Sequence, residues 1–146
     1  MRVFATLFAA AVLMVPAGNL KAQDAVNIGK NNITLKSDLM TPEALWAMGR
    51  IGAAEASPNG KKIVYQVGYY SVAENKSHQV LCLIDANGKN NRQLTTGSGN
   101  ETDASWIENG KRIAFLAGGN IWAMNADGTA RVQLTTTGDI EGYKFS

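Results

Sequence analysis

An internal repeat constrains the fold more than any other feature of this sequence. The segment DANGKNNRQLTT at 85–96 returns 40 residues later as NADGTARVQLTT at 125–136. Upstream, NGKKIVY from Asn59 returns as NGKRIAF from Asn109, at an offset of 50 residues. The offsets differ because the first unit holds ten more residues around GYYSVAENKSHQ. We assign these extra residues to a longer loop, because insertions in repeat proteins usually fall in loops.

Hydrophobic residues alternate within each unit, which indicates β-strands. The pairs Asn59-Gly60 and Asn87-Gly88 mark tight turns, because glycine adopts the positive φ that such turns need. Each unit is therefore expected to form a four-stranded meander of about 40 to 50 residues, the length of a propeller blade. In the first unit, we expect Ile63, Tyr65 and Val67 on one strand face and Val64 on the other.

The predicted fold is all-β, with two four-stranded antiparallel propeller blades at 53–97 and 101–137 and the start of a third at 138–146. The repeated Leu-Thr ending of each blade is expected to turn its leucine inward. Two blades and a fragment are expected to be part of a longer propeller, because known propellers close with four or more blades. The alternative is a small complete β-sandwich with eight strands.

The first 22 residues differ in character from the rest. Arg2 precedes an apolar run of about 14 to 16 residues that stops at Pro16, and Ala22 offers a small residue for cleavage. We therefore expect a signal peptide at 1–22 and a secreted or periplasmic protein. A membrane anchor is the alternative, but it needs roughly 20 apolar residues, so no stable anchor is expected.

Charge disfavours nucleic acid as a partner. The sequence has 14 basic and 12 acidic residues, and removal of Arg2 and Lys21 would bring the formal net charge to zero. A neutral chain lacks the positive field on which nucleic-acid binding depends. We therefore expect no nucleic-acid partner.

A short helix is predicted within the lead-in at 23–52, before the first blade. Thr41 can cap the helix with its hydroxyl, and Pro42 is a favoured first helical residue. Gly49 or Gly52 is expected to end it. The residues expected on its apolar side are Leu45, Met48 and Ile51, with Trp46 beside them.

The sequence holds one histidine and one cysteine, which limits its chemistry. A Ser-His-Asp triad would need His78 as its base, but we interpret His78 as an exposed polar residue before a strand. Cys82 is interpreted as a buried, small apolar residue, with a reactive thiol as the alternative. The string 97–99, Gly-Ser-Gly, lacks the G-x-S-x-G spacing of a hydrolase nucleophile. The DANG and NADG turns lack the closing glutamate of a calcium loop.

We therefore expect no catalytic, cofactor-binding or metal-binding residue in this sequence, and no cofactor. The stretch with most functional interest is the long hairpin at Tyr69, Tyr70 and Glu74, because a loop present on one repeat and absent from its twin often carries function. The alternative is that its aromatic residues cover the edge of the first blade.

A two-blade piece is also expected to expose blade faces that further blades would cover, and so to be poorly soluble or to oligomerise. Its oligomeric state is not predicted. These faces are expected to include some of the following residues: Ile63, Tyr65, Ile113, Phe115, Trp106 and Trp122.

The segment from Met40 to Ser77 resembles the opening of secreted bacterial peptidases of the prolyl oligopeptidase family, dipeptidyl-peptidase V type. Similar members begin with a helix of the form T-P-E-x-L-W-x-M-x-R, here 41–50, followed by S-P-[DN]-G-K, here 57–61. The second unit departs from this pattern, because Ile107-Glu108 stands where Ser-Pro is usual. In the first strand, 54–56 is Ala-Glu-Ala where a larger apolar residue is common.

The resemblance implies that this chain begins a propeller that caps a C-terminal α/β-hydrolase domain. That domain would carry a Ser, Asp and His that attack peptide bonds through an acyl-enzyme. The whole protein would release dipeptides from the N-termini of short peptides, while this chain alone would be inactive. The alternative is a periplasmic, TolB-like propeller that binds protein or glycan partners without catalysis.

Overall fold

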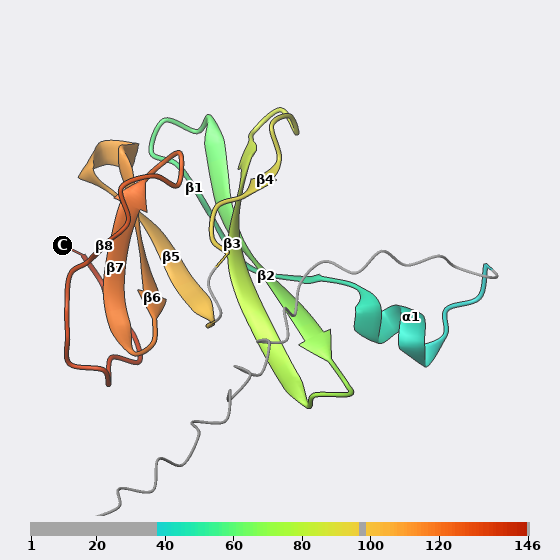
Figure 1. Cartoon of the computed structure of the whole chain (residues 1–146). Coiled ribbons are helices and arrows are strands. Elements are labelled where there is room, and N and C mark those ends of the chain that lie inside the picture. The colour runs from blue at the N-terminus through green and yellow to red at the C-terminus, as the bar shows by residue number, and fades with distance from the viewer. Residues whose placement is uncertain (1–37, 97–98, 146) are drawn as a thin grey trace, which may run out of the picture.

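Two four-stranded antiparallel sheets form the body of the described part of the protein (Figure 1). The computed structural model describes residues 38–96 and 99–145, so the expected signal peptide and residues 23–37 lie outside the described part. The strands of each sheet are hydrogen-bonded in sequence order, as a blade requires. This confirms the predicted all-β fold class of four-stranded propeller blades.

The first sheet follows a short helix and holds the longer strands. The helix is α1 (Pro42–Ala47), and the strands of the sheet are β1 (Arg50–Ala56), β2 (Lys62–Ser71), β3 (Lys76–Asp85) and β4 (Arg92–Gln93). The second sheet comprises β5 (Glu101–Ile107), the 3-10 turn η1 (Glu108–Gly110), β6 (Arg112–Ala117), β7 (Asn120–Asn125) and β8 (Val132–Gln133).

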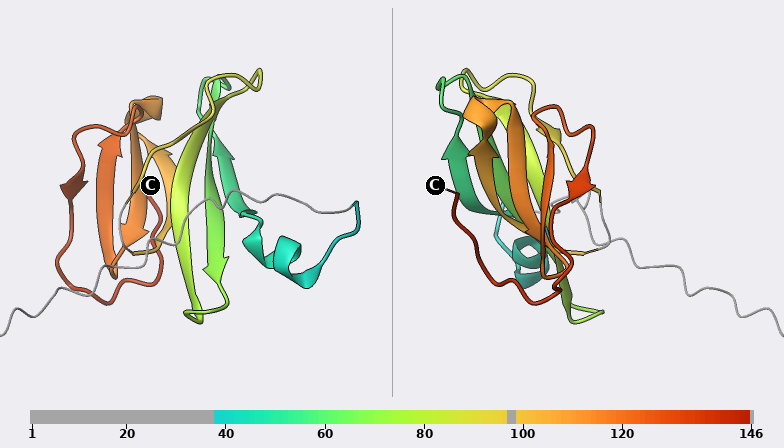
Figure 2. Two further views of the ribbon diagram at one scale, coloured as in Figure 1. Left: turned by 45° about the vertical axis from the view of Figure 1, so that its right-hand side comes forward. Right: turned by 90° about the vertical axis from the view of Figure 1, so that its left-hand side faces the viewer.

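The hydrophobic core lies between the two sheets, which stand face to face (Figure 2). Phe115 and Ile113 are fully buried, and Trp106 is 9% exposed. These three are among six residues of which some were expected on open blade faces, and they are buried because the two blades cover each other's facing sides. Burying each such side chain contributes roughly 1.5 to 3 kcal/mol. The remaining core residues are Val64, Leu81, Leu83 and Met124.

A second, smaller cluster lies on the other face of the first sheet. Val67, Val80 and Cys82 form it, with Tyr65 and Tyr69 packed against them. Its separation from Val64 agrees with the predicted alternation along β2.

The repeated sequence produces repeated hydrogen bonds. Gly88 N donates to Asp85 O over 2.8 Å, and Gly128 N donates to Asn125 O over the same distance. Both glycines have positive φ, as the predicted tight turns require.

The repeated Thr has a clearer role than the leucine before it. Thr95 Oγ1 accepts a hydrogen bond from Leu81 N, and Thr135 Oγ1 accepts one from Ile121 N, each at 2.9 Å. Leu94 packs against the core as predicted. Leu134 is 48% exposed, so the inward placement predicted for it was wrong.

Helix α1 begins as predicted and buries a different residue. Thr41 Oγ1 accepts a hydrogen bond from Ala44 N at 3.2 Å, which confirms the cap. Ala44 is the buried residue of the helix, whereas Leu45 is 47% exposed and Ile51 belongs to β1. The predicted apolar side was therefore wrong for both. A Cβ on Gly49 would lie 2.8 Å from Tyr69 Cε1, so glycine permits the close approach of chain and sheet here.

Most of the ten additional residues of the first unit lengthen the two strands instead of the loop between them, contrary to our expectation. The segment from the start of β2 to the end of β3 runs over 62–85, whereas its counterpart runs over 112–125. Pairing continues without interruption to Ser71 and Lys76. The extended ladder pairs backbone groups that an irregular loop would leave to water.

The missing Ser-Pro of the second blade has a backbone reason. Glu108 and Asn109 both adopt positive φ, at 48° and 55°. Proline cannot take such a φ because its ring fixes φ near −65°. In the first blade, Ser57 Oγ instead accepts a hydrogen bond from Lys62 N at 3.0 Å and closes the turn.

Residues 138–145, expected to start a third blade, carry no strand. Tyr143 Oη nevertheless donates to Asp103 O of β5 at 2.5 Å, and Ile140 N donates to Gly119 O at 3.0 Å. Burial raises the pKa of Tyr143. Within residues 38–96 and 99–145, there is no helix with the length and apolar character needed to cross a membrane.

Candidate functional site

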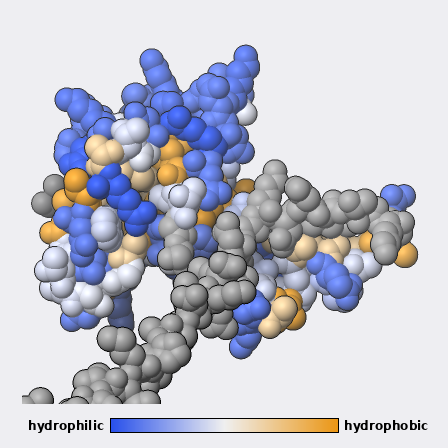
Figure 3. Space-filling model, viewed as in Figure 1, coloured by the Kyte–Doolittle hydropathy of each residue, from blue (hydrophilic) through white to orange (hydrophobic). Residues whose placement is uncertain are grey.

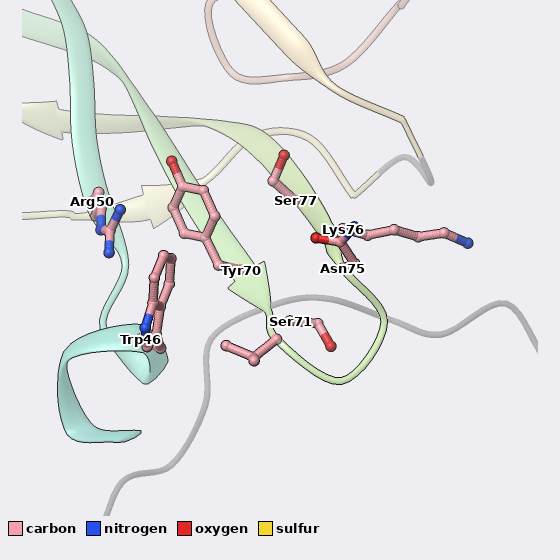
Figure 4. Close-up of a pocket in the computed structure, with 8 residues that line it drawn as sticks. Trp46, Arg50, Tyr70, Ser71, Asn75, Lys76 and Ser77 are labelled. Atoms are coloured by element: carbon pink, nitrogen blue, oxygen red, sulfur yellow. The ribbon is translucent and has the colours of Figure 1, made fainter. Parts of the chain in front are cut away.

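A cavity of about 450 Å³ lies where α1 meets the extended hairpin of β2 and β3 (Figure 4). Its size falls within the range of small-molecule sites, roughly 300 to 1,000 Å³. The walls come from α1, β1 and the hairpin of β2 and β3. The lining residues are Trp46, Arg50, Tyr70, Ser71, Val72 and 75–77.

The side chain of Arg50 stacks against two aromatic rings of this pocket. Its Cζ lies 4.7 Å from the ring centroid of Trp46 and 4.6 Å from that of Tyr70. The two rings meet edge to face, with centroids 6.0 Å apart. Attraction between a cation and an aromatic face holds the guanidinium in place although Arg50 itself is exposed.

Among the described residues that line the pocket are two cations and no carboxylate. Lys76 extends away from the aromatic pair (Figure 4). Within the described part of the chain, neither Arg50 nor Lys76 forms an ion pair. The site therefore presents a positively charged, aromatic surface.

Of the three hairpin residues predicted to be of functional interest, one lines the pocket. Tyr70 lines the pocket, whereas Tyr69 lies against Val67 on the opposite sheet face. Glu74 is exposed at the hairpin end, where its backbone N donates to Ser71 Oγ. The sequence analysis missed Trp46 and Arg50 as pocket residues. Their spacing of four residues was the available signal, but the helix ends between them.

A second polar cluster is buried between the blades around Glu101, which is 1% exposed. Thr95 Oγ1 donates to Glu101 Oε2 at 3.2 Å, and Arg131 Nη1 lies 3.4 Å from Oε1. Arg131 also stacks on the rings of Phe115 and Trp122, at 4.8 and 4.7 Å. The buried carboxylate thus has a cation and a hydroxyl beside it, as a buried charge requires. No sequence motif pointed to this cluster.

His78 belongs to this cluster and is 8% exposed, so its interpretation as an exposed residue was wrong. Its Nε2 lies 3.9 Å from Glu101 Oε2. A catalytic base must reach the proton of a substrate or nucleophile. His78 and Glu101 are instead both buried, at 8% and 1% exposed, so neither is presented to a substrate at the surface.

Cys82 is buried at 6% exposed, which confirms its interpretation as a core residue. Burial raises the pKa of its thiol, and a raised pKa disfavours the reactive thiolate. The string 97–99 falls partly outside the described residues. Within 38–96 and 99–145, no group of three His, Cys, Asp or Glu residues is placed to hold a metal ion.

Two curated proteins resemble this chain. It is 36% identical over 150 residues to the dipeptidyl-peptidase 5 of Porphyromonas endodontalis, and the match covers 99% of this chain. It is 39% identical over 78 residues, or 53% of its length, to the dipeptidyl-peptidase 5 of Porphyromonas gingivalis. This chain is related to the dipeptidyl-peptidase 5 proteins.

The comparison confirms the resemblance to a dipeptidyl peptidase that the sequence motifs indicated. The chain spans only 21% of the length of the first relative and 11% of the second, as expected for a segment of such a protein. No protein-family model matches the chain.

Proposed function

We propose that this chain is the non-catalytic propeller segment of a secreted serine peptidase that releases N-terminal dipeptides from short peptides. An α/β-hydrolase domain elsewhere in the whole protein would supply the catalytic Ser, Asp and His. The observation that carries the proposal is the match over 99% of this chain to a dipeptidyl-peptidase 5 of which it covers 21%.

The described chemistry supports a non-catalytic role for this segment. Its histidine and its best-connected carboxylate, His78 and Glu101, are both buried between the blades. The thiol of Cys82 is likewise buried. A nucleophile and base must be accessible to substrate within hydrogen-bond reach of one another. A stack of blades can instead form a wall that limits access to a neighbouring active site.

A chimera tests this proposal. The matched segment of the P. endodontalis relative is replaced by residues 23–146 of this chain, and hydrolysis of dipeptidyl-coumarin amides is compared with that of the unaltered relative. We expect the folded chimera to cleave the substrates. A folded chimera that lacks activity would contradict a shared role and favour the TolB-like binding alternative.

The isolated chain provides the second arm of this test. We expect no turnover of the same substrates and no labelling by a fluorophosphonate probe, which reacts with activated serines. The unaltered relative serves as the positive control. Labelling of the isolated chain would place a reactive serine within it and overturn the proposed division of labour.

We also propose that the protein is exported through a signal peptide at residues 1–22. The apolar run that ends at Pro16 supports this proposal, because it is shorter than a membrane span. Expression in a bacterial host with mass analysis of the periplasmic fraction tests it. We expect a periplasmic product that begins after Ala22. An uncleaved product in the membrane fraction would favour the anchor alternative.

A further inference from the structure

The two stacked arginines of the protein differ in one respect that points to a ligand. Arg131 lies on the rings of Phe115 and Trp122, and Arg50 lies on those of Trp46 and Tyr70. Arg131 directs a guanidinium N–H to the carboxylate of Glu101. Arg50 has no carboxylate partner in the described part of the chain. The two sites therefore share the aromatic support and differ in the anion.

Stacking leaves an arginine free to bind a carboxylate. The rings of Trp46 and Tyr70 are inclined to each other by 67°, so they do not enclose both flat faces of the guanidinium, and Arg50 remains exposed. The N–H donors of a guanidinium lie in its plane, at its edge. A carboxylate that approaches this edge can accept two parallel hydrogen bonds. The rings also hold the side chain in one arrangement, which reduces the conformational entropy lost on binding. The guanidinium of Arg50 is thus held in position to bind an anion, as the guanidinium of Arg131 binds Glu101.

The surroundings of Arg50 favour an anion attached to an organic group. Trp46 is 42% exposed, so part of its ring remains open to a ligand after it has contacted Arg50. Hydrophobic side chains reach the surface around α1, whereas the turns at the far ends of the strands are hydrophilic (Figure 3). The cavity of about 450 Å³ offers room beside the guanidinium for more than a simple ion.

We propose that this pocket binds the free C-terminal carboxylate of a short peptide. Arg50 would hold the carboxylate, and the exposed ring of Trp46 would contact the last side chain. This inference rests on the proposed function, because short peptides are the substrates of the proposed peptidase. It adds a contact between the propeller segment and the end of the peptide that is not cleaved.

Calorimetric titration of this chain with a tripeptide, Ala-Ala-Phe, tests the proposal. The matched probe is the same tripeptide with a C-terminal carboxamide, which keeps the shape and loses the negative charge. We expect the amide to bind at least about tenfold more weakly, because a charge-assisted bidentate pair is lost. Equal affinity for acid and amide, or no binding of the acid, would overturn the proposal.

Variants of two cationic residues assign the contact. We expect Arg50→Gln to weaken binding of the acid about tenfold or more, and Arg50→Lys to fall between it and the unaltered chain. Lys76→Gln is the matched control, because it removes one positive charge from the same cavity while its side chain points away from the aromatic pair. Equal losses in Arg50→Gln and Lys76→Gln would indicate a general electrostatic effect and overturn the proposal.

Two further arms keep the outcome decisive. If acetate or inorganic phosphate displaces the tripeptide at the concentration of the tripeptide itself, the site is a general anion site and the proposal fails. Circular dichroism of each variant confirms that the sheets are retained, and Arg50→Lys supplies the test if Arg50→Gln unfolds. Failure here would leave the proposed peptidase function standing, because the chimera assay measures hydrolysis and not binding by this chain.

Discussion

The two blades share a hydrogen bond that follows the last strand, and they differ in the hairpin of the second and third strands. In each blade, a threonine after the last strand accepts a hydrogen bond from the third strand at 2.9 Å. The hairpin of the second and third strands, however, runs over 62–85 in the first blade and 112–125 in the second. The shared bonds maintain the blade, and the added length carries the pocket beside α1.

The first strands of the two blades also lie in different environments. Every residue of β1 is exposed, whereas β5 contains buried Glu101 and Trp106. Trp106 Nε1 donates to Glu55 O of β1 at 3.1 Å, which joins the blades. The difference shows that equivalent strands acquire their burial from what stands against them, because β5 packs against β1, β2 and β3. Three pairs of matched substitutions and one single substitution test this view of the two blades.

The largest effect is expected from truncating the aromatic residue at the centre of the core. Phe115→Ala should reduce the free energy of unfolding by about 3 to 5 kcal/mol, because it leaves a cavity between the sheets. Tyr65→Ala, at the equivalent position of the first blade, should cost about 1 to 2 kcal/mol because Tyr65 is only half buried. Urea denaturation measures both. Equal losses would contradict a core confined to the facing sides of the blades.

The next largest effect is expected at the buried carboxylate. Glu101→Gln should cost about 2 to 3 kcal/mol, because it removes a buried charge that accepts a hydrogen bond from Thr95 and pairs with Arg131. Ile51 occupies the equivalent position in β1 and is 73% exposed, so Ile51→Ala should change stability by less than about 0.5 kcal/mol. The same denaturation measurement compares the two. If Glu101→Gln leaves the free energy of unfolding unchanged, the cluster contributes no net stability.

A smaller effect is expected from the repeated threonines. Thr95→Val should cost about 2 kcal/mol, because it leaves the N–H of Leu81 without its acceptor in the buried core. Thr135→Val should cost about 1 kcal/mol, because Ile121 is only partly buried. Hydrogen exchange at the Leu81 and Ile121 amides gives a local measurement. Unchanged protection of Leu81 in Thr95→Val would contradict this role.

The smallest effect is expected in the outer turn of the first blade. A hydrogen bond from Asn90 and the neighbouring Lys62 lower the pKa of the Asp85 carboxyl. This contribution to stability is therefore present above the unfolded pKa of about 3.9 and is lost as pH falls through the lower, folded pKa.

The second blade has Asn125 at the position equivalent to Asp85. Its turn therefore forms with an uncharged side chain at this position. Asp85→Asn should leave the turn folded and reduce the acid sensitivity of stability. Urea midpoints measured between pH 5 and pH 2 compare the variant with the unaltered chain. An unchanged pH profile would show that Asp85 makes no such contribution.

Much of this fold could be predicted from short-range rules. The Asn-Gly turns at 59–60 and 87–88 require positive φ, and the structure has it at both glycines. The hydroxyl of Thr41 caps α1 as its place before Pro42 predicted. Each of these features depends on residues within a few positions in the chain, and therefore appears in the sequence.

The candidate site and the burial of polar residues could not be predicted in this way. Trp46 and Tyr70 come together only because α1 packs against the extended hairpin, whose extra residues were expected to form a loop. His78 resembles any surface histidine until β5 places Glu101 beside it. Contacts between residues so far apart in the chain leave no periodic signal in a single sequence.

The sequence by itself determined the repeat, the four-strand order of each blade and the turns between strands, because these depend on local backbone preferences and hydrophobic alternation. The tertiary structure alone decided which face of each blade is buried, which arginine has a carboxylate partner and where the pocket opens. Those outcomes depend on how two similar sheets stack. The way the sheets stack decides which side chains are buried, whereas the local sequence pattern does not distinguish between them.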